Sequence, residues 1–182
     1  MSVTITNSPV HSEAMISYPY GVIDAGYSCG WHTGVDIVPH GNTENNPYVY
    51  PVYSGQVVYV SNDPTQALGC QVQILDSNNR YWRYCHLVEN SILVTVGQTI
   101  STNTPLGRMG ATGNVTGRHL HLECATTQNW NCDTFLNPCT NIGIPNEDDL
   151  VIYYIEPTPP IYTTKKSKFP FVLYARKLRA RN

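Results

Sequence analysis

The stretch GRHLHLE, residues 117–123, alternates histidine with leucine. Successive side chains of a β-strand point to opposite faces, so the alternation predicts a strand with Leu120 and Leu122 in a core. His119 and His121 then share the other face, about 7 Å apart along the strand. Such a pair can be two exposed histidines on the solvent-facing side of a sheet, or it can belong to a metal or catalytic centre. The rest of the chain has to distinguish these alternatives.

The composition of the 182-residue chain favours a β-rich fold. Only 13% of the residues are charged, while Gly, Pro and Tyr each occur 13 times, which is typical of short strands joined by turns. The length suits one domain with a hydrophobic core. The sequence has no long apolar run and no basic-then-apolar leader, so it predicts neither a transmembrane helix nor a secretory signal.

Hairpin patterns recur along the chain. The segment 50–60, YPVYSGQVVYV, has two β-rich runs around Ser54-Gly55, and the segment 70–87 has strand-like runs on both sides of the turn-forming residues 76–79. Shorter strand-like runs follow within 91–110, and no long amphipathic helix precedes the C-terminal region. We therefore predict an all-β, antiparallel domain whose loops rim a narrow substrate groove.

Two further motifs add metal-ligating side chains. WHTGVD, residues 31–36, places His32 and Asp36 on a loop that enters a predicted strand, from which both side chains can converge on one ion. His86 ends another predicted strand, and alternation places it on the face opposite Cys85 and Leu87.

Together with the pair at 119 and 121, these motifs give four histidines and one aspartate, a set that suits a catalytic zinc ion. Catalytic zinc commonly takes three nitrogen or oxygen ligands and leaves one position to water, whose pKa it lowers. No HExxH motif is present to supply an adjacent glutamate base. Histidines that do not bind the ion can instead transfer protons near neutral pH. The sequence therefore predicts one zinc ion per chain and a hydrolytic reaction.

The ordered segments HTGVD, YCHL and GATGNVTGRHLHLE resemble the lysostaphin/LytM-type zinc metalloendopeptidases, a peptidoglycan hydrolase family of bacterial cell walls. The resemblance covers roughly residues 15–145. It implies a LytM-like fold with three zinc ligands, which are His32, Asp36 and His121. It also implies an unliganded catalytic pair, with His119 as the preferred general base and His86 stabilising the oxyanion. Family members use a transition-state tyrosine before the first ligand, and Tyr27 is the nearest match.

The resemblance further implies a substrate and a place of action. The substrate would be a peptide bond in the stem or cross-bridge of peptidoglycan, next to glycine if the groove is narrow. A monomeric phage lytic enzyme fits, either an endolysin released at lysis or a lysin carried on the virion, acting at the cell wall. The alternatives are a secreted bacterial wall hydrolase or bacteriocin, a non-catalytic wall-binding or activator domain, and a small structural metal protein. No nucleic-acid partner is expected.

Charge is segregated along the chain. Residues 165–182 contain seven of the eleven basic residues, while all thirteen acidic residues come earlier. We predict a zinc endopeptidase domain over 1–155, a Pro-rich linker over 156–164 and a basic tail over 165–182. The tail could contact teichoic acid or an anionic membrane, or it could only aid solubility or dock on the acidic body.

Several other residues carry open alternatives. The six cysteines form no CxxC pair, which disfavours a structural zinc site; Cys85 and Cys124 are predicted in the core, and Cys132 and Cys139 are the candidate disulfide pair. Glu123 shares the predicted face of His121 and either orients that ligand or lies exposed. Arg118 is either a solvated arginine or a reader of a substrate carboxylate at the cleft edge. His11 and His40 match no motif and are predicted to be surface residues.

Overall fold

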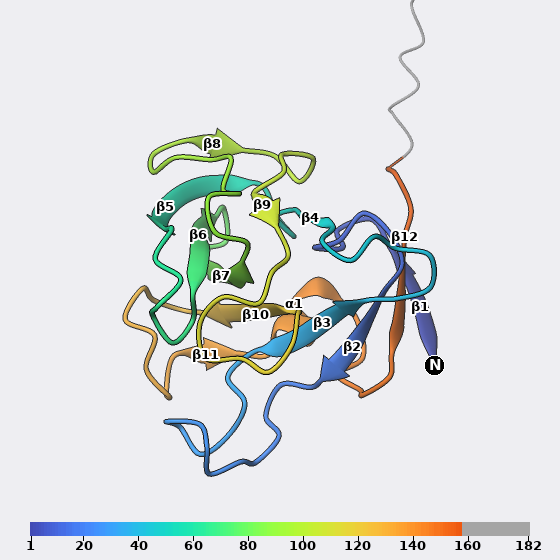
Figure 1. The fold of residues 1–182 in the computed structure, drawn as a ribbon, viewed down its shortest axis with the longest axis horizontal. Helices are drawn as coiled ribbons and strands as arrows, with labels where there is room; N and C mark the ends of the chain where they lie inside the picture. Colours follow the sequence, from blue (N-terminus) through green and yellow to red (C-terminus); the bar gives the residue numbers. More distant parts are fainter. Residues whose placement is uncertain (158–182) are drawn as a thin grey trace, which may run out of the picture.

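A computed structural model describes residues 1–157, and these form an almost entirely β structure (Figure 1). The predicted all-β fold is therefore confirmed. The helix α1 is a single short turn, and none of the helical structure within 1–157 is long and apolar enough to cross a membrane. In chain order the elements are β1 (Ser2–Ile5), β2 (Ala14–Tyr18), β3 (Val35–Pro39), β4 (Tyr48–Val49), β5 (Gly55–Ser61), β6 (Cys70–Asp76), β7 (Tyr81–Leu87), β8 (Thr99–Ile100), β9 (Gly107–Arg108), β10 (Leu120–Ala125), β11 (Phe135–Leu136), α1 (Pro138–Ile142) and β12 (Val151–Tyr154).

One large sheet organises the described residues, with the strand order β1-β12-β2-β3-β10-β7-β6-β5-β8. Neighbouring strands pair antiparallel except β1 and β12, which run parallel, and β11 extends the edge of β10 beyond β3. Strands β4 and β9 form a separate two-stranded sheet. As Figure 1 shows, β10 lies between β3 and β7, so the HxH motif sits in the interior of the sheet. The predicted linker from 158 onward and the predicted basic tail lie outside the described residues.

The hydrophobic core lies on one face of this sheet. Leu120 and Leu122 of β10 are fully buried there beside Trp82 and Tyr84 of β7. The Tyr84 hydroxyl accepts a hydrogen bond from the Val52 amide at 3.0 Å, so burying this polar group leaves no unpaired oxygen. The alternation in the sequence thus correctly assigned the two leucines of β10 to the core.

Of the two predicted hairpins, one is confirmed and one is wrong. Strands β6 and β7 pair across the turn at 76–79 as predicted. Residues around Ser54-Gly55 form no hairpin, because β4 pairs with β9 while β5 pairs with β6 and β8. Gly55 has a different role: a Cβ atom at this position would lie 2.3 Å from the Leu75 carbonyl oxygen, so glycine permits the close approach of β6.

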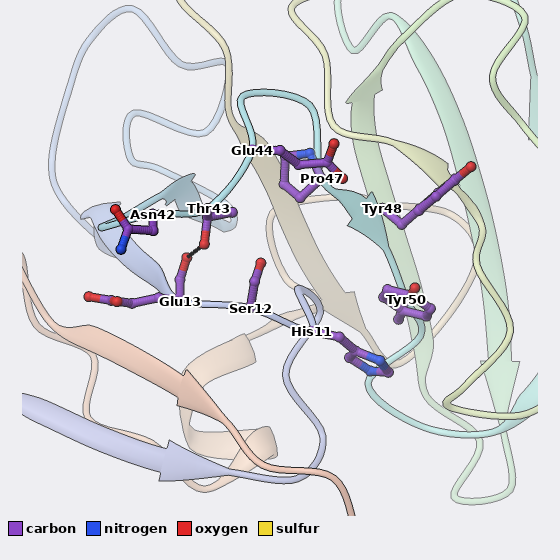
Figure 2. Close-up of a pocket in the computed structure, with 9 residues that line it drawn as sticks. All are labelled: His11, Ser12, Glu13, Asn42, Thr43, Glu44, Pro47, Tyr48 and Tyr50. Carbon is purple, nitrogen blue, oxygen red and sulfur yellow. Dashed lines mark hydrogen bonds between the residues drawn. The ribbon is translucent and has the colours of Figure 1, made fainter.

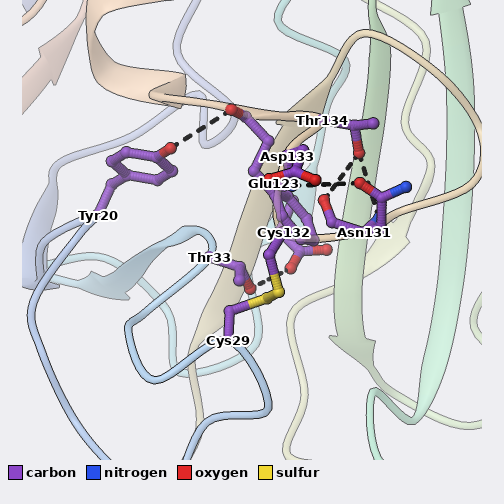
Figure 3. The surroundings of a disulfide bond; sticks show 9 residues. Tyr20, Cys29, Thr33, Glu123, Asn131, Cys132, Asp133 and Thr134 are labelled. Carbon is purple, nitrogen blue, oxygen red and sulfur yellow. Dashed lines mark hydrogen bonds between the residues drawn. A yellow bond between two sulfur atoms is a disulfide. The ribbon is translucent and has the colours of Figure 1, made fainter.

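The disulfide prediction needs correction. Cys132 bonds to Cys29 rather than to Cys139, which is buried as a free thiol in α1. The bond joins the loop that precedes His32 to the loop that follows β10 (Figure 3). Cys29 lies 103 residues before Cys132, and the pairing of β3 with β10 brings these two loops together. Local sequence spacing therefore pointed to the wrong partner.

We expect reduction of the Cys29–Cys132 bond to lower the free energy of unfolding by about 2–4 kcal/mol. A cross-link that closes a loop of this length restricts the unfolded chain strongly. Denaturant unfolding with and without reductant measures the difference. A Cys29→Ser/Cys132→Ser double variant is the control, because reductant should not change its stability. Equal unfolding midpoints for the wild-type chain in both conditions would contradict this prediction.

Candidate metal centre

Three predicted ligands come together at the pairing of β3 with β10. Asp36 lies directly opposite His121 in the register of the two strands, and cross-strand partners share a face of the sheet. His32 belongs to the loop just before β3, where Gly34 lets the backbone pass close to β10. A Cβ atom at Gly34 would lie 2.7 Å from the ring of His121, so the glycine of HTGVD is required by this close approach.

The three side chains converge through one atom each. Asp36 Oδ1 lies 2.8 Å from His121 Nδ1 and 3.2 Å from His32 Nε2, and the two ring nitrogens are 3.0 Å apart. These atoms form a possible metal-binding group in the described part of the chain. His32 and His121 are buried, whereas Asp36 is partly exposed.

The outer nitrogens of both imidazoles are already engaged. His32 Nδ1 lies 2.8 Å from the Pro19 carbonyl oxygen, which can only accept, so His32 donates there and presents a lone pair at Nε2. His121 Nε2 similarly lies 3.1 Å from a carboxylate oxygen of Glu123. With Nε2 as the donor, neutral His121 presents its Nδ1 lone pair to the same point as His32 Nε2 and Asp36 Oδ1. Three lone pairs that converge in this way require a cation between them.

The electrostatics of the cluster agree with this requirement. Burial by itself would raise the pKa of the Asp36 carboxyl, but contacts with His121 and His32 outweigh burial and hold that pKa below its usual range. Burial would lower the pKa of His121, yet the carboxylates of Glu123 and Asp36 raise it to about 9. Without a metal, a proton on His121 supplies the positive charge. Because a metal would displace that proton, metal binding is expected to release it.

His86 and His119 lie beside this cluster, with their rings 4.8 Å apart between centroids. His86 Nδ1 donates to the Thr112 carbonyl at 2.8 Å, and His119 Nδ1 donates to the Gly117 carbonyl at 3.0 Å. Each ring therefore keeps a free lone pair on Nε2, and His119 Nε2 lies 3.6 Å from Asp36 Oδ1. Burial lowers the pKa of His86 to about 4, which keeps this ring neutral at physiological pH.

A β-bulge gives His86 its position. The register of β6 with β7 shifts between Cys70 and Val72, and His86 adopts a positive φ of 61°. Regular alternation predicted Cys85 on the face opposite His86, and this is wrong, because Cys85 pairs with His121 and shares its face. Cys85 is buried as predicted, but it lies beside His121 on the face of the histidine cluster, outside the main hydrophobic core.

Two tyrosines border the cluster. The Tyr27 ring lies 5.1 Å from the His32 ring, and burial, together with the Asp36 charge, raises the pKa of Tyr27 to about 12. Its hydroxyl therefore stays protonated and can donate. Tyr18, at the end of β2, lies 4.9 Å from the His32 ring and pairs with Asp36 in the strand register. No motif marked Tyr18, and only the pairing of β2 with β3 reveals it.

The structure decides the alternatives for Glu123, which is buried and contacts His121. Arg118 is exposed, which fits both of its alternatives. His11 is half-buried rather than a plain surface residue, since it stacks between the rings of Tyr50 and Tyr154 at 3.7 and 3.9 Å. His11 also lines a cavity of about 400 Å³, whose lining includes none of the histidines of the candidate site. Figure 2 shows the lining residues. His40 lies 3.6 Å from Glu13 at the edge of this region.

Comparison with known proteins identifies the class of this fold and site. The model of peptidase family M23 matches residues 30–133, which include the four histidines and the aspartate of the candidate site but not Tyr27. The chain therefore belongs to peptidase family M23, and the resemblance seen in the sequence is confirmed.

Individual relatives refine this assignment. The peptidoglycan DD-endopeptidase ShyA of Vibrio cholerae is 41% identical over 91 residues, which cover 48% of this chain and 20% of ShyA. The chain thus matches about a fifth of the length of that relative. The catalytic domain of the antimicrobial peptidase lysostaphin from Staphylococcus simulans has the same fold, with a TM-score of 0.58 at 24% identity over 72% of this chain and 92% of that domain. A zinc-containing peptidase from Vibrio cholerae superposes with a TM-score of 0.53 at 28% identity, covering 65% of this chain and 36% of its own.

Proposed function

We propose that the chain is a zinc-dependent endopeptidase that hydrolyses a peptide bond in bacterial peptidoglycan. The observation that supports this most is the convergence of lone pairs from His32, Asp36 and His121, next to two more histidines with free Nε2 atoms. Two nitrogen ligands and one carboxylate are a donor set that catalytic zinc commonly takes. A bound zinc ion would supply a Lewis acid that lowers the pKa of water and polarises a carbonyl group.

The remaining residues would handle protons. His119 is the preferred general base, because its free Nε2 faces Asp36 and can accept the proton of the attacking water. His86 also presents a lone pair on Nε2, so it can donate to an oxyanion only after it has taken a proton. Tyr27, whose hydroxyl keeps its proton, can donate to a developing negative charge without such a step.

The bond cleaved is proposed from the relatives. The relative ShyA is named a peptidoglycan DD-endopeptidase, and the prefix DD points to D-configured residues, whereas glycine has no stereocentre. This similarity favours a bond of the peptidoglycan stem peptides over a glycine-containing cross-bridge. The monomeric state expected from the sequence stays a prediction.

Digestion of purified sacculi tests the function directly. We expect new amino termini to appear on incubation with the zinc-loaded protein, and to disappear when a chelator removes the metal and return when zinc is restored. The residue carrying each new amino terminus identifies the bond, and sacculi with and without glycine cross-bridges distinguish the two substrate proposals. New reducing sugar ends without new amino termini would reject an endopeptidase, and an unreactive zinc-loaded protein would favour a non-catalytic wall-binding domain.

The setting of this activity is also a proposal. Disulfides persist in oxidising surroundings, so the Cys29–Cys132 bond supports a place of action outside the cytosol. A phage lytic enzyme and a secreted bacterial wall hydrolase or bacteriocin both meet that condition.

We propose 1–155 as the catalytic domain. Removal of 165–182 would test the predicted contact of the basic tail with teichoic acid or membrane. If the tail contributes, the truncated chain should bind walls more weakly than the full chain at low salt, and high salt should erase the difference.

A further inference from the structure

Glu123 occupies a buried position next to the candidate metal centre. It follows His121 by two residues on β10, so both side chains lie on the same face of the sheet, and only 1% of Glu123 is exposed. Burial of a charged carboxylate is unfavourable in free energy unless the carboxylate is paired and hydrogen-bonded. Its contacts therefore explain why the chain retains an acidic residue here.

Both carboxylate oxygens are engaged. Glu123 Oε1 accepts a hydrogen bond from the Thr33 hydroxyl at 2.6 Å and lies 3.1 Å from His121 Nε2. Glu123 Oε2 is paired with the guanidinium of Arg83, the residue opposite it on β7. One carboxylate thus contacts a candidate ligand, the residue adjacent to His32, and a neighbouring strand. Figure 3 shows its hydrogen bond with Thr33.

An aromatic side chain covers the outer end of this arrangement. The Arg83 guanidinium lies 4.1 Å from the ring centroid of Trp130, and the Trp130 indole N–H donates to Gln73 at 3.1 Å. Trp130 belongs to the loop that the Cys29–Cys132 bond fastens to the segment before His32. The Trp130 ring therefore shields the Arg83 guanidinium from solvent on the side that Glu123 does not contact, so the positive charge acts mainly on Glu123.

We propose that Glu123 is a positioning residue for the metal centre. By accepting the Nε2 proton of His121, Glu123 fixes the ring rotation and the tautomer that turn Nδ1 toward His32 and Asp36. Its hydrogen bond with Thr33 holds the segment that carries His32 to the same carboxylate. Both histidine ligands are thereby oriented before an ion arrives. This inference rests on the proposed function, in that it assumes zinc is the ion bound.

Zinc affinity, measured by competition with a chelator, tests the inference. We expect Glu123→Ala to weaken zinc binding by about 10–100-fold, the range found when a residue behind a metal ligand is removed. Glu123→Gln, whose amide oxygen can still accept from Nε2, should recover part of that loss. Glu89→Ala is a matched control, because Glu89 is an exposed glutamate after β7 and should leave zinc affinity unchanged.

Because Glu123→Ala leaves the partly buried Arg83 without its partner, a second variant keeps the test decisive. Thr33→Val removes only the hydroxyl that donates to Glu123, and we expect a smaller but measurable loss of zinc affinity. In zinc-loaded protein, nitrogen NMR should show the His121 proton on Nε2 in the wild type and weaker protection of that proton in Glu123→Ala. Unchanged zinc affinity in both Glu123→Ala and Thr33→Val would overturn the inference. Failure of the wild-type chain to bind zinc would instead reject the proposed function.

Discussion

Replacement of His121 with alanine should abolish both zinc binding and peptidoglycan hydrolysis. The substitution removes Nδ1, which lies 2.8 Å from Asp36 Oδ1 and 3.0 Å from His32 Nε2, and leaves a two-ligand site that holds zinc poorly. The side chain of Leu122, on the opposite face, keeps its place in the core. Since the loss concerns the ligand set, excess zinc is expected to restore little activity.

Metal analysis of the purified variant measures this loss, and far-UV circular dichroism shows that the variant is folded. His40→Ala is the matched control, because His40 lies beside Glu13 at the far end of β3 and belongs to no ligand group. It should keep full zinc content and activity. One zinc ion per chain in folded His121→Ala would refute the ligand assignment.

Replacement of His86 or His119 should separate catalysis from metal binding. Neither ring belongs to the group formed by His32, Asp36 and His121, so each alanine variant should keep its zinc. Hydrolysis should fall by about 10²–10⁴-fold in each, which is the contribution typical of a general acid or base. Loss of zinc from either variant would show that ligand and catalytic roles are exchanged relative to the proposal.

The dependence of the rate on pH gives an independent measure of the role of His86. The His86 ring is neutral above its pKa and takes up a proton as the pH falls through it, so any contribution of this ring to the pH–rate profile appears at that pKa. With a pKa of about 4, His86 stays neutral down to mildly acidic pH, and a nearby cation would lower its pKa further. His86 therefore should not cause a loss of rate between pH 6 and 8 on its own. If His86→Ala removed a titration near pH 6.5 that the wild type shows, this assignment would be wrong.

Local patterns in the sequence predicted much of the structure around the candidate site. The alternation around Leu120 and Leu122 correctly predicted β10, and the HTGVD motif correctly predicted a loop entering β3. The first prediction succeeded because strand periodicity reports directly which side chains enter the core. The second succeeded because Gly34 among β-branched residues indicates a loop that enters a strand. The roles of the individual site residues stay proposals until variants are measured.

Features that depend on strand pairing between distant parts of the chain could not be predicted from local sequence patterns. Nothing in the chain marks His86 as the residue with a positive φ in a bulge, so alternation misplaced Cys85. The partner of Cys132 could not be recognised from spacing, because strand order across the sheet brings Cys29 to it. Tyr18 was missed because it reaches the site through the pairing of β2 with β3.

The pairing of β3 with β10 also has a kinetic consequence. Asp36 and His121 are 85 residues apart in sequence, and β1 pairs with β12 across most of the described chain. Contacts of such high contact order form late, because the entropy of closing long loops is lost before the contacts stabilise the chain. Folding on the order of milliseconds to seconds is expected for such an all-β topology. Until β3 and β10 have paired, the chain has no complete set of metal ligands. A nascent or partly folded molecule would therefore have no hydrolytic activity.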